Sequence, residues 1–170
     1  MGQTIISAGL IIIVTIAVIN ANRLIINAST SKLEGLARME GADIAMAVIT
    51  EARLKKFDEN AIDTEYQSTS AFTAASSLGR ESGEWAGNPD GYPFNSASAF
   101  DDFDDYDGYQ RTVNTVSLSG YLVSCTVYYA TRYYPDTPVT SREYFKTLEV
   151  YVSHSLYLPN PIRISITKSY

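Results

Sequence analysis

Apolar residues are concentrated at the start of this chain. Residues 5–19 contain no charged side chain, and the apolar character resumes at residues 24–26 after the polar stretch 20–23. A soluble domain rarely leaves its most apolar segment outside a core, so another hydrophobic surface must cover this one. That surface is expected to be a lipid bilayer, other copies of the same helix, or both in turn.

Three interpretations of this segment compete. A cleaved signal peptide needs a basic region before its apolar run, and only residues 1–4 precede this one. A transmembrane anchor needs about 20 apolar residues, which residues 5–26 provide, with Arg23 reaching the interface. The third is a helix that lies in a membrane first and packs into a filament core later. Small residues that let helix backbones approach closely favour the third: Ser7, Ala8, Gly9, Thr15, Ala17 and Ala21.

Helical character extends beyond the apolar run, because no proline occurs before Pro89 and helix-forming residues dominate up to about residue 60. Two arrangements are open. Either a second helix begins near Ser31, with Glu34 as its capping-box partner, or one helix runs from about residue 4 to about residue 57. The single helix would be about 80 Å long. The points at which it would bend most easily are Gly35, Gly41 and the Asn20–Asn22 stretch.

The second half of the predicted helix has apolar residues on two sides. Such a helix needs two partners, which we expect to be its own C-terminal domain and a neighbouring subunit. One side comprises Leu33, Leu36, Ala37, Ile44, Ala47, Val48 and Leu54, interrupted by Glu40 and Glu51, and the other comprises Met39, Met46 and Ile49.

Residues 61–110 are rich in small and polar residues and have no regular period. A turn is expected at Asn88–Gly91, where proline fixes φ and glycine admits a positive φ. The whole segment is interpreted as a variable surface loop region between helix and sheet.

Four stretches of alternating apolar and polar residues follow, at 111–118, 121–130, 144–154 and 162–167, with a polar turn at 131–141. Such alternation predicts an antiparallel sheet with one buried face, which the helix covers. The predicted fold class is therefore α+β: a long N-terminal hydrophobic α-helix packed on a C-terminal four-stranded antiparallel β-sheet head. Its parts are an apolar membrane or filament-core helix (1–30), an amphipathic continuation (31–60), the loop region (61–110) and the sheet head (111–170).

Composition excludes several functional classes. The net charge of −6, with scattered Lys and Arg, leaves no basic stripe to bind phosphates, so nucleic acid is not expected as a partner. Cys125 is the only cysteine and is expected to be a buried, inert thiol. His154 is the only histidine, and no catalytic partners for it are recognisable. We expect neither an enzyme nor a cofactor.

An acidic run at residues 101–108 has two interpretations. The favoured one is a solvated acidic loop. The other is a calcium site, because calcium prefers clustered carboxylate oxygens, although the EF-hand spacing fails at Phe103. The candidate calcium ligands are Asp102, Asp104, Asp105 and Asp107.

A long helix with an apolar first half, then a variable loop, then a four-stranded antiparallel meander resembles the type IV pilin superfamily of pilins, pseudopilins and related filament subunits. The resemblance covers the whole chain as architecture. Gly2 followed by Gln3 is similar to the family's processing site, where a peptidase cuts after glycine. Counting from Gln3, the fifth position is Ser7, where the family commonly has glutamate. The resemblance is thus to a pilin-like subunit with an atypical N-terminus.

The expected function is that of a structural subunit of an extracellular, pilus-like helical filament on the cell surface. The subunit would lie in the cytoplasmic (inner) membrane before assembly machinery adds it to copies of itself. The alternative is a single-pass membrane-anchored β-domain binding protein that does not polymerise. The side chains expected to form the filament core are Ile5, Ile6, Leu10, Ile13, Ala17 and Leu24.

Overall fold

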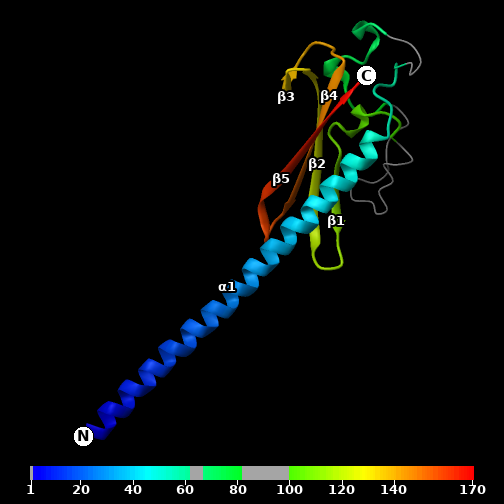
Figure 1. Ribbon diagram of the computed structural model, residues 1–170. Coiled ribbons are helices and arrows are strands. Elements are labelled where there is room, and N and C mark those ends of the chain that lie inside the picture. The colour runs from blue at the N-terminus through cyan, green and yellow to red at the C-terminus, as the bar shows by residue number, and fades with distance from the viewer. Residues whose placement is uncertain (1, 62–66, 82–99) are drawn as a thin grey trace.

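The computed structural model describes residues 2–61, 67–81 and 100–170, and it places a β-sheet head at the C-terminal end of one long helix (Figure 1). Helix α1 spans Gly2–Arg53. The predicted class, a long apolar N-terminal helix with a C-terminal antiparallel sheet, is confirmed. The later elements are η1 (Thr69–Ala71), η2 (Ala75–Ser77), η3 (Asp104–Tyr106), β1 (Gln110–Asn114), β2 (Ser119–Thr131), β3 (Tyr134–Val139), β4 (Phe145–His154) and β5 (Leu158–Ser169).

Of the two helix arrangements, the structure has the single helix of 52 residues, about 78 Å long. Ser31 lies inside it rather than at a cap. Hydroxyls along its apolar half bond to the carbonyl four residues earlier: Thr15 Oγ1 donates to Ile11 at 2.8 Å and Thr30 Oγ1 to Ile26 at 3.0 Å. Because these hydroxyls donate to the helix backbone, they do not need water as a hydrogen-bond partner.

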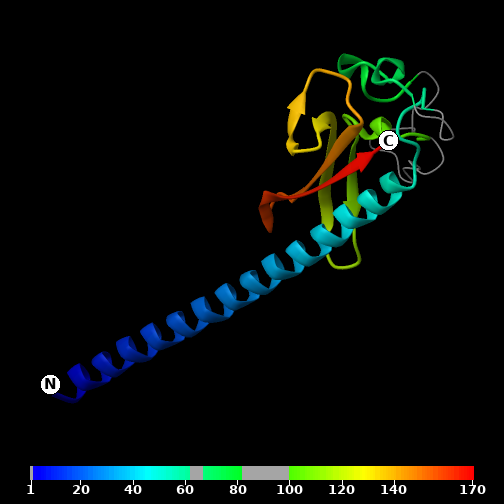
Figure 2. The same ribbon diagram turned by 45° about the horizontal axis from the view of Figure 1, so that its top comes forward.

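The second half of α1 packs on one face of the sheet, mainly over β4 and β5 (Figures 1 and 2). Gly41 lies at a close approach: a Cβ there would be 3.1 Å from Leu158 Cδ2 and 3.2 Å from Ile162 Cδ1. Helix α1 is continuous through Gly41, and the glycine is a packing position.

The buried face of α1 is rotated about the helix axis relative to the predicted stripe. Ile49 is buried rather than turned outward, while Ala47 and Leu54 are exposed. The reason is that α1 comes close to the sheet at Gly41, and this contact decides which face is buried. Glycine has no apolar side chain, so the pattern of apolar residues did not indicate this position. The buried residues of this face are Ala37, Gly41, Ile44, Ala45, Val48, Ile49 and Ala52.

The sheet is antiparallel, with the order β1-β2-β4-β5 and with β3 paired to β2. The four predicted strands are present. The fifth, β3, lies within the stretch expected to be a polar turn because of Pro135 and Pro138. Proline is tolerated in a strand with few ladder bonds, and the pairs here are Tyr129↔Val139 and Thr131↔Tyr134.

The core lies between α1 and the sheet and includes part of the predicted loop region. The alternating residues of β2 point into it as expected, from Tyr121 to Tyr129. Residues 100–109 were expected at the surface, yet four aromatic side chains at a spacing of three residues are buried: Phe100, Phe103, Tyr106 and Tyr109. The turn expected at Asn88–Gly91 lies outside the described residues.

Candidate functional site: a projecting apolar helix

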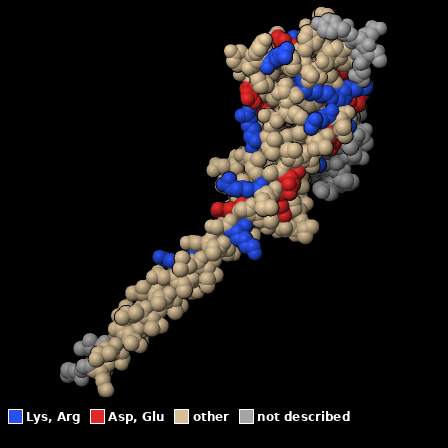
Figure 3. Space-filling model, viewed as in Figure 1, with Lys and Arg blue, Asp and Glu red and all other residues tan. Residues whose placement is uncertain are grey.

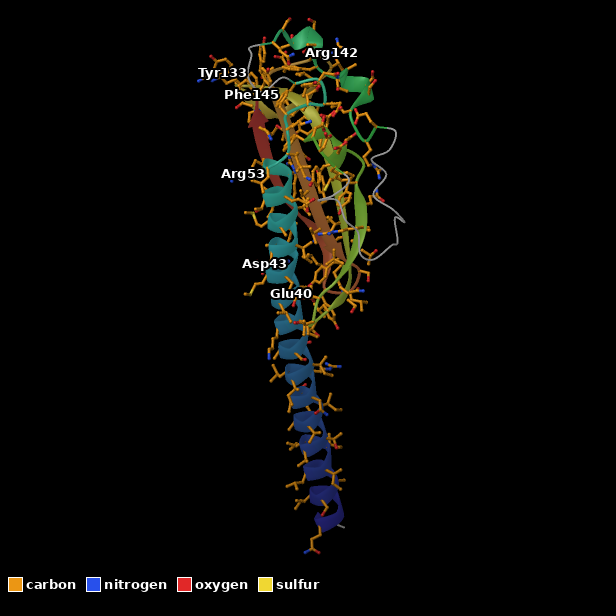
Figure 4. The ribbon with its side chains drawn as sticks, turned by 90° about the vertical axis from the view of Figure 1, so that its right-hand side faces the viewer. Glu40, Asp43, Arg53, Tyr133, Arg142 and Phe145 are labelled. Carbon is orange, nitrogen blue, oxygen red and sulfur yellow. The ribbon has the colours of Figure 1, made fainter. Side chains whose placement is uncertain are left out.

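The N-terminal half of α1 projects away from the head with its side chains uncovered. Residues 6–26, here called the shaft, carry twelve large apolar side chains that are about half exposed or more. Ile6 is 70% exposed, and Ile13 and Leu24 are each 69% exposed. Figure 4 shows the side chains radiating from the helix below the level of Glu40, where the head begins. Among the described residues, α1 is the one helix long and apolar enough to cross a membrane.

The shaft is apolar on every side. Helical geometry places the predicted core residues Ile6, Leu10, Ile13, Ala17 and Leu24 within one narrow seam, because their spacings are four, three, four and seven residues. The remaining large side chains cover the rest of the circumference: Ile11, Ile12, Val14, Ile16, Val18, Ile19, Ile25 and Ile26. A helix that is apolar all round is one that is surrounded, by lipid or by several neighbours. The side chain of the other predicted core residue, Ile5, lies outside the described part.

Charge is absent from the described helix before Arg23, and it gathers on the head and its junction with the helix (Figure 3). The two predicted processing residues lie at the free end, with Gly2 already helical. Gln3 is exposed, and its carbonyl accepts a hydrogen bond from Ser7 Oγ at 2.9 Å. Ser7 therefore satisfies its hydroxyl within its own helix.

Comparisons with protein-family models, with curated proteins and with solved structures find no match.

Two glutamates that interrupt the predicted apolar stripe join α1 to the head. Glu40 Oε2 accepts from Thr115 Oγ1 at 2.7 Å and from the hydroxyl of Tyr121 at 3.0 Å. Glu51 Oε1 accepts from the hydroxyl of Tyr106 at 2.7 Å. These bonds fix the rotation and the height of the helix on the sheet. The head is thus held in one orientation relative to the shaft.

The acidic run is not a solvated loop. Asp102, Asp104 and Asp105 are buried, because the aromatic residues between them anchor the segment in the core. Asp107 Oδ1 accepts the backbone N–H of Val127 at 2.8 Å. Within the described part of the chain, no group of three or more His, Cys, Asp or Glu residues is arranged to hold a metal ion. Asp102 Oδ1 likewise accepts the backbone N–H groups of Asp104 and Asp105, at 2.8 and 3.2 Å.

A buried lysine explains this burial of carboxylates. Lys146 Nζ lies 2.7 Å from Asp58 Oδ2 and is also in direct contact with Asp104 Oδ1, and all three side chains are 0–1% exposed. Nζ also donates to the carbonyl of Phe57 at 2.9 Å. We call Lys146, Asp58 and Asp104 the buried triad. The sequence indicated that Lys146 is buried. It has the same place in the alternation of β4 as three inward-facing apolar residues: Leu148, Val150 and Val152.

The two aspartates of the triad lie in different environments. Burial opposes ionisation of Asp58, but hydrogen bonds from Lys146 and from the backbone of Thr73 and Asn60 outweigh it and lower its pKa. Burial raises the pKa of Asp104 to about 8, with the nearby Asp102 and Asp58 carboxylates adding to the rise and Lys146 opposing it. One carboxyl is therefore held ionised and the other is held as the acid near neutral pH.

Cys125 and His154 have structural contacts. Cys125 is buried in β2, and burial raises the pKa of its thiol to about 12, which leaves it unreactive. His154 Nδ1 accepts from the backbone N–H of Leu156 and of Tyr157, at 3.3 and 3.2 Å, and Nε2 lies 3.0 Å from the carbonyl of Ser119. The ring therefore closes the turn between β4 and β5.

Proposed function

We propose that this chain is a structural subunit of an extracellular, pilin-like helical filament. The observation that carries the proposal is the shaft: an apolar helix, exposed on every side, rigidly continuous with a folded head. Its apolar surface needs a cover in each state of the protein. Before assembly that cover is the cytoplasmic membrane, and after assembly it is the shafts of neighbouring subunits.

The continuity of α1 supports a filament over a simple anchor. A membrane anchor needs no fixed angle to its domain, and a flexible linker serves it well. A helical polymer requires that every head take the same orientation relative to the core. Here one helix runs from the shaft into the head, and Glu40 and Glu51 bond it to the sheet.

The energetics also fit a polymer. Burying a large apolar side chain is worth about 1.5–3 kcal/mol relative to water, so a free shaft is not stable in solution. Transfer from lipid to a bundle gains little from the hydrophobic effect, and close packing drives it instead. Gly9 and Ala17 provide places for close approach, and, apart from its chain neighbours and the adjacent helix backbone, no described atom lies within 4 Å of a Cβ built at Gly9.

The alternative is a single-pass membrane protein that presents the head for binding and never polymerises. The length and apolar composition of the shaft favour it equally, since α1 is long and apolar enough to cross a membrane. In this case the shaft stays in lipid and the head acts as a monomer.

Negative-stain electron microscopy of material sheared from cells expressing the full-length chain separates the two functions. We expect thin, regular filaments from the wild type and none from Ile13→Asp, which places a charge in the shaft seam. Val116→Asp is the matched control, because Val116 is fully exposed on the head and the same charge there leaves assembly intact. Filaments from Ile13→Asp, or a detergent-solubilised monomer as the only wild-type product, would refute the assembly function.

A further inference from the structure

The buried triad has the arrangement needed for a spontaneous condensation between two of its own side chains, with the third side chain moving the protons. A primary amine, Lys146 Nζ, lies in direct contact with one carboxyl oxygen of Asp104 and 2.7 Å from a second carboxylate, Asp58. Fixed proximity of this kind raises the effective concentration of reacting groups by many orders of magnitude. We propose that Lys146 Nζ and Asp104 Cγ form an intramolecular amide bond that joins β4 to η3.

The surroundings of the amine favour its reaction. Nζ lies 4.8 Å from the centre of the Phe57 ring and 5.3 Å from that of Tyr129, and the side chain is fully buried. In such a site desolvation penalises charged groups, and the neutral amide product carries no such penalty. Water, which would compete as a nucleophile and favour hydrolysis, has little access.

Asp104 is the carboxyl suited to be attacked. Its Oδ2 has no hydrogen-bond partner among the described residues, so the contact of Oδ1 with Lys146 is what opposes its protonation. A raised pKa keeps it protonated near neutral pH, and a protonated carboxyl has a hydroxyl that can leave.

Asp58 is suited to move protons rather than to be attacked. Its oxygens accept from the backbone N–H of Thr73 at 2.9 Å and of Asn60 at 3.1 Å, and from the hydroxyl of Tyr129 at 3.3 Å. These donors hold it in place as an anion beside Nζ. A positioned carboxylate within hydrogen-bond reach of the reacting nitrogen is a general base.

The reaction balances with these three groups alone. Lys146 first gives a proton to Asp58, and the neutral nitrogen attacks Asp104 Cγ. Asp58 then passes its proton to the departing hydroxyl and takes a second proton from the nitrogen. The N–C bond forms, the C–OH bond breaks, one water leaves, and Asp58 ends protonated. No oxidant, nucleotide or metal takes part.

Peptide mapping by mass spectrometry of the full-length chain, purified in detergent, tests the proposal. We expect a branched tryptic peptide that contains both Asp104 and Lys146, weighs one water less than the sum of its two parts, and is not cleaved after Lys146. Linear peptides with cleavage after Lys146 would overturn the proposal. So would a bond from Lys146 to Asp58. Loss of water at Asp107–Gly108 as a succinimide is distinguished because its peptide stays linear.

Three variants assign the roles. Lys146→Arg is expected to remove the branched peptide, and Asp58→Asn to remove it while both reacting groups remain. Asp104→Asn is expected to give the same branched product, since the amine then displaces ammonia instead of water. A branched peptide in Asp58→Asn would contradict the role of Asp58. If a variant fails to fold, the wild-type map decides alone, and its result is independent of filament formation.

Discussion

The hydroxyl of Tyr121 on β2 donates a hydrogen bond to Glu40 on α1 at 3.0 Å, and so joins the first turns of the docked helix to the head. Tyr121 is fully buried, and phenylalanine fits the same space. We expect Tyr121→Phe to lower the free energy of unfolding by about 1.5–3 kcal/mol, as for a hydrogen bond to a charged group. Urea unfolding in detergent measures it. Tyr133→Phe, at a residue 82% exposed, is the control and should change stability by less than about 0.5 kcal/mol.

The same contact predicts a dependence on pH. Burial opposes ionisation of Glu40, but hydrogen bonds from Thr115, Ser117 and Tyr121 lower its pKa overall. A carboxyl with a lowered pKa in the folded state contributes stability above its unfolded pKa, about 4.3, and loses it as pH falls through the folded value. We expect Glu40→Gln to flatten the acid side of the stability profile below about pH 4.3. An unchanged acid limb would contradict this, and Glu34→Gln, on the exposed side of α1, is the control.

Gly41 should tolerate a large side chain far less than Gly35 does. A Cβ at Gly41 would lie 3.1 Å from Leu158 Cδ2, whereas one at Gly35 would meet no described atom within 4 Å apart from its chain neighbours and the adjacent helix backbone. We expect Gly41→Leu to destabilise the head by about 1–3 kcal/mol through overpacking, and Gly35→Leu to be neutral or stabilising because leucine favours the helix. Thermal unfolding compares the pair. Equal effects at both positions would show that α1 is not docked through Gly41.

Close approach of shafts is testable without adding charge. Gly9→Leu keeps the shaft apolar, so the protein should still partition into membranes, while the added side chain keeps neighbouring backbones apart. We expect loss of filaments with an unchanged membrane fraction, measured by electron microscopy and by fractionation. Filaments of normal yield would show that Gly9 faces no neighbour. Val18→Leu, which enlarges an already large side chain, is the control.

The sequence predicted the elements better than their contacts. Period-2 alternation located four strands because each buries one face, and the absence of proline and the apolar run located α1. The strand β3 was missed because Pro135 and Pro138 indicated a turn and the alternation around them is weak. An edge strand tolerates proline, because few of its backbone N–H groups take part in the ladder. The face of α1 was misplaced, because it is set by Gly41, whose role depends on Leu158 and Ile162 more than a hundred residues later.

The candidate sites were predictable to different degrees. The shaft follows directly from composition, since nothing in the described part of the chain covers it. The acidic run was predicted to be a solvated loop because it contains five aspartates. The aromatic residues between them pack in the core, and so three of the neighbouring aspartates are buried as well. The buried triad joins residues 58, 104 and 146, and only the inward position of Lys146 in the alternation of β4 pointed to it. Its assembly is a property of the fold.

The proposed amide should be visible in the stability of the head. It closes a loop between residues 42 positions apart, for which loop-closure entropy alone gives about 4 kcal/mol at 25 °C. Asp104→Asn forms the same bond and should unfold like the wild type. Asp104→Leu forms no bond but leaves Lys146 paired with Asp58, so it should lose most of that stabilisation without exposing a lone buried charge. Urea unfolding of the two variants isolates the covalent link. Equal stability of the Asn and Leu variants would show that the link contributes nothing to the folded head.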